Sequence, residues 1–308
     1  MKTTKIVILG MGGVGGFYGG KLAKRYAGSS NIGIYFIARG QHLHTIQQSG
    51  IQIITDTEDF IAKPTLATDN ADEIGVVDYI IIATKSYHLK SSIDQIRPCI
   101  GANTVIIPLL NGGDITERIS KILPDNIIWS GCSYIVSRRI APGIIRTSGT
   151  FHKLIFGFDG GENQQLHNFE KLLQEAEIDI NYSKKIRESV WRKFFFISVS
   201  ASLTSYLNCT FNELVNTKEN KEMTIRFAKE FLLVAQAEGI DLGENPLEHI
   251  VNRSEVLPVG TTTSMHSDFK AGRSTELETL TGVVIELAHK HKISVPLYQE
   301  VYDELKNR

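Results

Sequence analysis

The sequence predicts an α/β protein in which a doubly wound parallel sheet is followed by an all-helical domain. A glycine-rich turn at residues 10–15 lies between an apolar strand pattern and a helical pattern. Further near-continuous apolar runs are typical of strands whose two faces are covered by helices. In the second half, strand patterning disappears and helical periodicity replaces it. We therefore expect a Rossmann-type nucleotide-binding domain over residues 1–182 and a helical substrate and catalytic domain over 183–308.

Composition and charge are those of an ordinary globular protein. The chain has 308 residues, of which 42% are hydrophobic and 22% are charged, with a net charge of −1. This balance gives no reason to expect nucleic acid or a membrane as partner. The three cysteines are far apart and form no metal-binding pair, which is typical of a reducing compartment. This cysteine pattern also gives no reason to expect a metal site. Too few apolar residues precede the first glycine for a signal peptide, so we expect a cytoplasmic protein.

The glycine turn has the spacing G-x-G-x-x-G, which is specific only in the right structural context. Here it follows a strand pattern and opens a helix. The first glycine permits the tight turn, the second lets the backbone approach a pyrophosphate, and the third lets the helix pack on the sheet. The alternative is a structural turn without a ligand. The predicted cofactor contacts in this turn are Gly10, Met11, Gly12, Gly13, Val14 and Gly15.

A residue just beyond the second predicted strand, 32–37, indicates which nucleotide is bound. An NAD site usually has an acidic residue there, which binds the ribose 2′-hydroxyl. This sequence has Arg39 instead, and a guanidinium can form a bidentate pair with a 2′-phosphate. A solvated surface arginine is the alternative. We predict NADP(H) as the cofactor.

Two polar side chains follow the next apolar strands, at 76–83 and 104–110. They are Lys85 and Asn111. In open α/β sheets, ligands bind outside the carboxyl ends of the strands. Both residues are therefore predicted to face a bound cofactor or substrate, although each taken alone would more often be an ordinary loop residue.

Beyond residue 127 the pattern first changes and then becomes helical. Short β segments at 132–137, 143–147 and 153–156 are expected to add antiparallel strands to the sheet edge, followed by a helix at 163–177 and a strand at 178–182. Helices are predicted at 186–207, 221–238, 246–253 and 274–291, the last with Ser274 as its N-cap, and a turn-rich segment at 257–273.

Lys193 lies in a strongly apolar helical segment, directly before three phenylalanines. Apolar surroundings disfavour the ammonium form, which suits a lysine to proton transfer. The alternative is that the side chain extends along the helix and keeps its charged end in solvent. The residues alone leave both open.

Taken together, the motifs resemble the ketopantoate reductase family, the 2-dehydropantoate 2-reductases. The resemblance covers most of the chain and implies an N-terminal Rossmann domain, a helical domain like the C-terminal domain of 6-phosphogluconate dehydrogenase, and NADPH as cofactor. The matching segments are the glycine turn, Arg39, and residues 83–85, 110–112, 142–143, 155–157, 190–193, 263–265 with Asp268, and 273–277.

The resemblance also implies a role for each matched residue. Lys193 corresponds to the general acid that protonates the ketone oxygen. Glu276 corresponds to the acid that orients the substrate hydroxyl and the lysine. Asn111 corresponds to a residue bridging nicotinamide and substrate, Ser264 to a ligand of the substrate carboxylate, and Lys85 to a lysine near the cofactor.

Three positions depart from the family pattern. The family has asparagines where this chain has Ile197, Ala201 and Phe211. Residues 193, 197 and 201 share one helix face because they are four residues apart. A pocket that loses hydrogen-bonding partners binds a polar substrate less well, by about 1–3 kcal/mol per unpaired group.

Three functions follow from these observations. The first is NADPH-dependent reduction of 2-dehydropantoate, in pantothenate and coenzyme A biosynthesis. The second is reduction of a 2-oxo acid with a more apolar side chain. The third is a non-catalytic NADPH sensor, which would need neither Lys193 nor Glu276. The helical surface of the second half is compatible with a homodimer.

Overall fold

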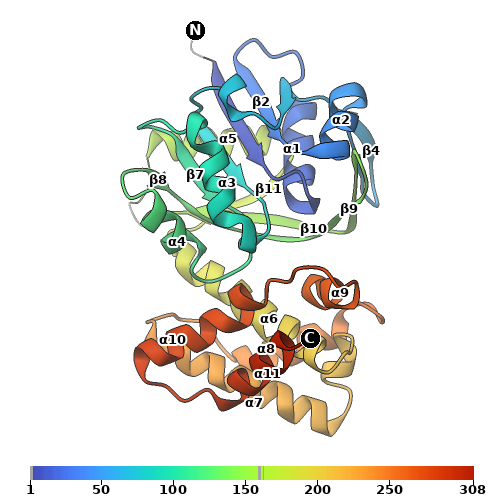
Figure 1. The fold of residues 1–308 in the computed structure, drawn as a ribbon, viewed down its shortest axis with the longest axis vertical. Helices are drawn as coiled ribbons and strands as arrows, with labels where there is room; N and C mark the ends of the chain where they lie inside the picture. Colours follow the sequence, from blue (N-terminus) through green and yellow to red (C-terminus); the bar gives the residue numbers. More distant parts are fainter. Residues whose placement is uncertain (1–2, 159–160, 162) are drawn as a thin grey trace. The chain divides into compact units, whose positions relative to one another are not determined.

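The computed structural model describes residues 3–158, 161 and 163–308, and the chain forms two compact units. The first comprises Met1–Leu110 and Ile115–Ile186, and the second comprises Asn111–Asp114 and Arg187–Arg308. Figure 1 shows the first unit in blue to green and the second mainly in yellow to red. The division falls at Ile186 rather than at residue 182, because one continuous helix begins there. The short loop Asn111–Asp114 belongs to the second unit, although the chain around it belongs to the first.

The first sheet of the first unit is parallel throughout and confirms the predicted Rossmann-type arrangement. Its strand order is β5-β2-β1-β6-β7-β8. The chain proceeds from β1 to β2 and β5 and then returns to β6 on the other side of β1, so the end of β1 lies at the point where the order reverses. The strands are β1 (Thr4–Leu9), β2 (Ile32–Ile37), β5 (Leu66–Thr68), β6 (Tyr79–Ile82), β7 (Val105–Pro108) and β8 (Ile127–Ile128).

Alternate side chains of these strands pack into two different cores. In β1, Ile6 and Ile8 belong to one hydrophobic core, whereas Val7 and Leu9 belong to the other. Because strand side chains alternate between faces, apolar residues at every position mean that both faces are covered. The helices of this part are α1 (Gly13–Arg25), α2 (Gly40–Ser49), α3 (Leu89–Ile96) and α4 (Ile115–Ile122), with 3₁₀ turns η1 (Ala71–Glu73), η2 (Ser86–His88) and η3 (Arg97–Cys99).

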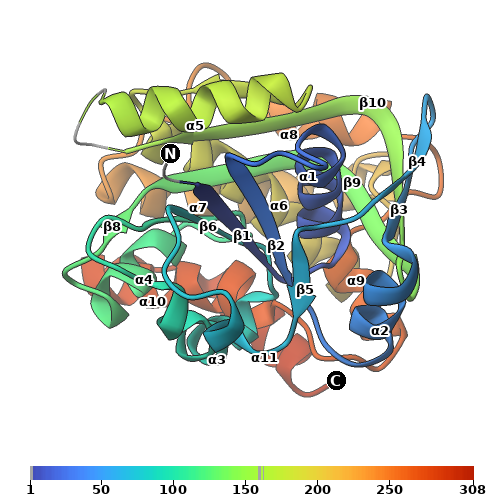
Figure 2. The same cartoon turned by 90° about the horizontal axis from the view of Figure 1, so that it is seen from above.

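The segments expected at the edge of this sheet form a separate second sheet instead. Two long strands pair antiparallel, and strands from the 51–62 region extend the same sheet. Figure 2 shows α1 beside these strands. Small residues let α1 approach closely, since a Cβ at Gly16 would lie 2.6 Å from Ile145 Cγ1 and one at Gly20 would lie 2.5 Å from Ile53 Cγ1. The strands are β3 (Ile51–Ile54), β4 (Asp59–Ala62), β9 (Ser130–Ala141), β10 (Ile144–Gly157) and β11 (Asp179–Tyr182).

The edge prediction was wrong because strand periodicity does not specify a strand's partner. α1 carries apolar side chains on two faces, so a second apolar layer is needed to cover it. The helix after this hairpin is α5 (Gln164–Glu175), where Asn163 caps the N-terminus by accepting from the Leu166 N–H at 2.8 Å.

The second unit is helical, as predicted, around a core rich in aromatic side chains. Phe231 contacts Trp191, Phe194 and Phe195, and Phe227 stacks on Tyr298. Two of its helices were not predicted, namely α9, which has only seven residues, and α11, which follows the long helical segment that ends at His291. The elements are α6 (Ile186–Tyr206), η4 (Asn212–Leu214), α7 (Lys218–Ala237), α8 (Pro246–Val256), α9 (Ser264–Lys270), the π-helical turn η5 (Glu278–Gly282), α10 (Val283–His291) and α11 (Pro296–Lys306).

The helix expected to begin at Ser274 begins later. The first helical residue is Leu277, and a π-helical turn follows before α10. Ser274 is therefore not its N-cap. Across the described residues, no helix combines the length and apolar character needed to span a membrane.

Candidate functional sites

The glycine turn has the geometry that a dinucleotide needs. Gly10 has a φ of +95°, which favours glycine strongly. A Cβ at Gly15 would lie 2.1 Å from the Gly10 carbonyl oxygen, so the third glycine permits the helix to start directly against the turn. A Cβ at Gly12 would meet no atom of the described residues within 4 Å. The space beside the second glycine is thus open, where a pyrophosphate would approach.

The N-terminus of α1 suits an anion. Gly12 is its N-cap and has no side chain that could accept hydrogen bonds from the N–H groups of the first turn, and this turn carries no acidic residue. The first N–H groups of a helix have no partner within it, and the helix dipole favours negative charge there. These residues therefore fit the pyrophosphate of a nicotinamide dinucleotide.

Arg39 lies where β2 ends and forms the backbone N-cap of α2. Its side chain is exposed, and its guanidinium donates a hydrogen bond to Gln95 Oε1. Gln95 in turn donates to the Asp69 carbonyl oxygen at 2.9 Å. The structure thus anchors the guanidinium at the end of β2, a feature that the sequence pattern did not reveal.

Lys85 follows β6, whose carboxyl end lies against the glycine turn. A Cβ at Gly10 would lie 2.7 Å from Thr84 Cγ2, so the residue before Lys85 contacts the turn. Lys85 itself is half-buried and precedes η2. The residues of the first unit that were predicted to bind the cofactor therefore lie at the ends of neighbouring strands.

Two further side chains hold the glycine turn, and sequence reasoning missed both. His42 is only 5% exposed, and it donates from Nε2 to the Met11 carbonyl oxygen at 2.7 Å. Its Nδ1 accepts the Gly143 N–H at 2.8 Å, which fixes this tautomer because an N–H can only donate. Ser137 donates to the Gly13 carbonyl oxygen at 2.9 Å. No local pattern marks either residue, since their partners lie far away in the sequence.

In the second unit, Lys193 and Asn111 are hydrogen-bonded. The Lys193 Nζ donates to Asn111 Oδ1 at 2.8 Å, and both side chains are partly buried. The loop carrying Asn111 packs closely on α6, since a Cβ at Gly113 would lie 2.5 Å from Phe194 Cδ1. Lys193 is therefore neither fully enclosed by apolar side chains nor extended into solvent. It is half-buried, and its ammonium group is directed at the side-chain amide of Asn111.

Glu276 is 4% exposed and lies directly before the last long helical segment. Its carbonyl oxygen accepts the Leu280 N–H at 2.9 Å. Two serines of α6 hold the π-helical turn that follows, Ser198 by donating to the Leu280 carbonyl oxygen and Ser202 by bonding the Thr281 hydroxyl at 2.7 Å. π-helical turns often occur at functional sites, and this one begins two residues after the buried Glu276.

Ser264 is the exposed first residue of α9, and its neighbour Thr263 is the N-cap of that helix. Thr263 is hydrogen-bonded to Thr204 of α6 at 2.9 Å. Thr204 shares the helix face of Lys193, because the two residues are about three helical turns apart. The structure thus connects the N-terminus of α9, where Ser264 lies, with the C-terminal part of this face.

The three positions that depart from the family pattern differ in burial. Ile197 is half-buried and Ala201 is buried. Phe211 is 7% exposed and stacks on Phe196, with ring centroids 5.8 Å apart. Phe211 is therefore a core residue of this unit, in contact with another aromatic ring of α6.

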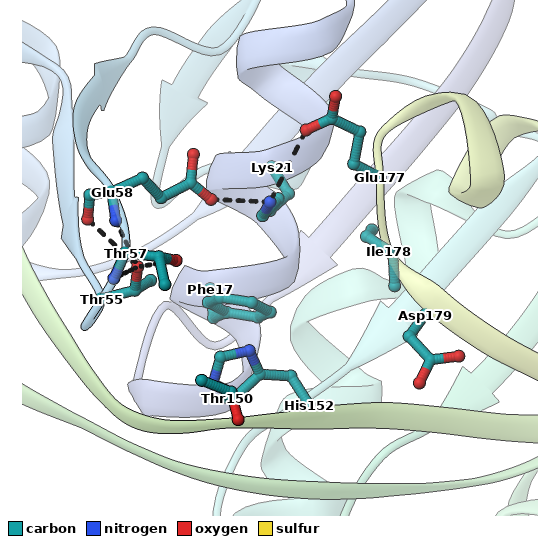
Figure 3. Close-up of a pocket in the computed structure, with 10 residues that line it drawn as sticks. All are labelled: Phe17, Lys21, Thr55, Thr57, Glu58, Thr150, His152, Glu177, Ile178 and Asp179. Carbon is teal, nitrogen blue, oxygen red and sulfur yellow. Dashed lines mark hydrogen bonds and ion pairs between the residues drawn. The ribbon is translucent and has the colours of Figure 1, made fainter.

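A separate hollow of about 300 Å³ is lined by Phe17 and Lys21 of α1 and by residues of the second sheet such as His152 (Figure 3). None of the predicted site residues lines it. Internal ion pairs occupy its walls, because Lys21 pairs with Glu58 at 2.7 Å and with Glu177 at 4.0 Å. Burial works against the ionised form of Glu58, but Lys21 and Lys24 hold its pKa below the ordinary value. Among the described residues, no group of three or more His, Cys, Asp or Glu side chains could hold a metal ion.

A parallel sheet with a glycine turn at its switch point, joined to a helical unit that carries a lysine–amide pair, defines a two-domain nicotinamide-dependent oxidoreductase. Family models assign the chain more narrowly. "Ketopantoate reductase PanE/ApbA" matches residues 6–159, and "Ketopantoate reductase PanE/ApbA C terminal" matches residues 185–308. The chain therefore belongs to the ketopantoate reductase family, whose members are NADP-dependent oxidoreductases.

Individual relatives agree with this assignment. The 2-dehydropantoate 2-reductase of Mesorhizobium japonicum is 30% identical, with 92% of this chain and 91% of that protein covered. The crystal structure of 2-dehydropantoate 2-reductase from Porphyromonas gingivalis W83 is 32% identical, with a TM-score of 0.85 and 99% of each chain covered. D-mandelate dehydrogenase, solved with NADH and anilino(oxo)acetate, shares the fold at 23% identity, with a TM-score of 0.83 over 99% and 98% of the two chains. The fold alone therefore does not specify the substrate.

Proposed function

We propose that the protein catalyses the NADPH-dependent reduction of 2-dehydropantoate to pantoate, a step in pantothenate and coenzyme A biosynthesis. The observation that carries this proposal is the hydrogen bond from Lys193 to Asn111 at 2.8 Å. This bond directs the ammonium group of Lys193, the proposed proton donor, at one specific amide oxygen. The relatives named 2-dehydropantoate 2-reductase support the choice of substrate.

In this proposal, each residue of the second unit has a separate task. When bound, NADPH supplies the hydride that reduces the ketone carbon. Negative charge then develops on the ketone oxygen, and Lys193 stabilises this charge and donates the proton that completes the hydroxyl group. Asn111 orients the ammonium group, Glu276 orients the substrate hydroxyl, and Ser264 binds the substrate carboxylate.

The first unit binds the cofactor. The glycine turn holds the pyrophosphate through backbone N–H groups and the N-terminus of α1, Arg39 binds the 2′-phosphate, and Lys85 lies near the cofactor. The open space beside Gly12 and the position of Arg39 at the end of β2 support this assignment.

Ile197, Ala201 and Phe211 favour a second candidate, reduction of a 2-oxo acid with a more apolar side chain. These residues offer no side-chain hydrogen bonds to a hydroxyl group, so such a substrate would leave no polar group unpaired there.

Steady-state oxidation of NADPH, with NADH measured in parallel, tests both candidates. 2-Dehydropantoate and a series of 2-oxo acids with apolar side chains serve as acceptors. The first candidate predicts the highest kcat/KM with 2-dehydropantoate and a preference for NADPH. The second is supported if the apolar acids are reduced more efficiently. NADPH binding without turnover of any 2-oxo acid would contradict both.

A further inference from the structure

The carbonyl oxygens of the glycine turn are held by side chains from elsewhere in the first unit. The Met11 carbonyl oxygen accepts from His42 Nε2 at 2.7 Å, and the Gly13 carbonyl oxygen accepts from the Ser137 hydroxyl at 2.9 Å. These donors come from α2 and β9 respectively. Two segments that are distant from the turn in sequence thus contribute to its conformation.

The direction of a carbonyl group determines the direction of the next N–H group. In a trans peptide the C=O and the following N–H point in opposite directions, and none of the described peptide bonds is cis. A Met11 carbonyl directed at His42 therefore turns the Gly12 N–H away from His42. In the same way, a Gly13 carbonyl directed at Ser137 turns the Val14 N–H away from the hairpin of β9 and β10.

Both donors are themselves fixed. His42 is buried, and its second ring nitrogen accepts the Gly143 N–H at 2.8 Å, so the ring cannot rotate without losing both bonds. The Ser137 hydroxyl is 2.9 Å from that of Thr147, a fully buried residue. Since the Ser137 proton is used for Gly13, Thr147 donates to Ser137. The backbone of Ser137 also packs directly against the glycine turn, because a Cβ at Gly13 would lie 2.1 Å from the Ser137 carbonyl oxygen.

We propose that His42 and Ser137 are positioning residues of the cofactor site, which aim the Gly12 and Val14 N–H groups at the cofactor pyrophosphate. An anion needs N–H groups and is repelled by carbonyl oxygens, so holding two carbonyl groups back lowers the cost of ordering the turn upon binding. This role rests on the proposed binding of NADP(H) at the glycine turn.

Two ligands separate this role from general stabilisation of the fold. NADP⁺ contains the pyrophosphate, whereas adenosine 2′-phosphate has the 2′-phosphate and adenosine but no pyrophosphate. The dissociation constant of NADP⁺ and the inhibition constant of adenosine 2′-phosphate are measured for the full-length protein and for Ser137→Ala and His42→Ala. Ser137→Thr retains the hydroxyl group, and Ser148→Ala removes an exposed hydroxyl group from the same hairpin as a matched control.

We expect Ser137→Ala and His42→Ala each to weaken NADP⁺ binding by about tenfold, the effect of one lost hydrogen bond. Binding of adenosine 2′-phosphate should change by less than about twofold, because substitutions far from a ligand usually alter its binding free energy by only a few tenths of a kcal/mol. Ser137→Thr should restore NADP⁺ binding, and Ser148→Ala should leave both ligands unaffected. Thermal unfolding monitored by circular dichroism shows whether each variant is folded. If His42→Ala does not fold, the test rests on Ser137→Ala.

Two results would overturn the proposal. Equal weakening of both ligands would mean that the side chains support the fold only, and unchanged NADP⁺ binding in both variants would mean that they do not position the turn. A wild-type protein that binds no NADP⁺ would instead contradict the proposed cofactor site itself.

Discussion

The Nζ of Lys193 donates a hydrogen bond to Oδ1 of Asn111 at 2.8 Å, across 82 positions of the sequence. Asn111 follows a strand of the first unit, yet it belongs to the second unit together with the helix that carries Lys193. The proposed acid and the amide that orients it are therefore held within one compact unit. Movement of one unit relative to the other would leave this pair unchanged.

Replacing the proposed general acid should abolish chemistry and spare cofactor binding. Lys193→Ala should lower kcat by about 10²–10⁴-fold, the contribution of a positioned proton donor. NADPH affinity should remain near the wild-type value, because the glycine turn lies in the other unit. Steady-state kinetics and a direct NADPH titration measure the two effects. Lys218→Ala, at an exposed position of α7, is the control, and equal kcat values in both variants would exclude Lys193 as the acid.

Placing a carboxylate beside Lys193 should change the pH dependence of the reaction. In Asn111→Asp, a negative charge would lie next to the ammonium group and favour its protonated form. The alkaline limb of the kcat/KM profile should therefore move to higher pH, and the maximal rate should fall because the lysine gives up its proton less readily. Asn111→Ala adds no charge and should not move the limb upward. A limb that stays in place in Asn111→Asp would show that Lys193 does not control it.

Removing Arg39 should reduce the preference for NADPH over NADH. Hydrogen bonds to charged groups contribute about 1.5–3 kcal/mol, so the ratio of kcat/KM for the two cofactors should fall by about 10- to 100-fold in Arg39→Ala. The value for NADH should stay nearly constant, because NADH lacks the 2′-phosphate. Arg97→Ala, which removes an exposed arginine paired with Asp94, is the matched control. An unchanged ratio would contradict the role of Arg39.

Restoring one asparagine of the family pattern should test the substrate. Ile197 is half-buried and lies one turn beyond Lys193 on the same helix face. Ile197→Asn should raise kcat/KM for 2-dehydropantoate and lower it for apolar 2-oxo acids, with a gain of about 5- to 100-fold if a new hydrogen bond to the substrate forms. Competition between the two classes of acid measures this directly. Phe211→Asn is less suitable, because it would bury an amide in the place of a stacked ring. Equal changes for both classes would show that residue 197 does not contact the substrate.

The stability of the fold should depend on His42 at mildly acidic pH. Burial lowers the pKa of His42 below its ordinary value of 6.5; the hydrogen bond to Met11 opposes this effect, and Arg139 adds to it. Below pH 6.5 the unfolded chain therefore binds a proton that folded His42 does not. The contribution of His42 to the free energy of unfolding should be fully present above this pH. It should decline as the pH falls toward the lowered pKa, by at most about 1.4 kcal/mol per pH unit. Urea unfolding at several pH values should show a weaker decline in His42→Gln than in the wild type. Parallel declines would contradict this prediction.

Several features of this protein follow from the sequence alone, because they depend on local patterns. The spacing of Gly10, Gly12 and Gly15 predicted the turn, since only glycine permits such close backbone approach. Apolar runs predicted the strands of the parallel sheet, and helical periodicity predicted the second unit. The combined motifs indicated the ketopantoate reductase family, which the family models confirm.

Other features were decided only by tertiary structure. The partners of β9 and β10, the bond between Lys193 and Asn111, and the anchoring of Met11 by His42 all join segments distant in the chain. Periodicity states which face of an element is apolar, but it does not state which surface will cover that face. Hydrogen bonds of this kind form only when packing has already brought the two groups together. For this reason, candidate residues for the chemistry could be proposed from the sequence, whereas the residues that hold the glycine turn in place could not.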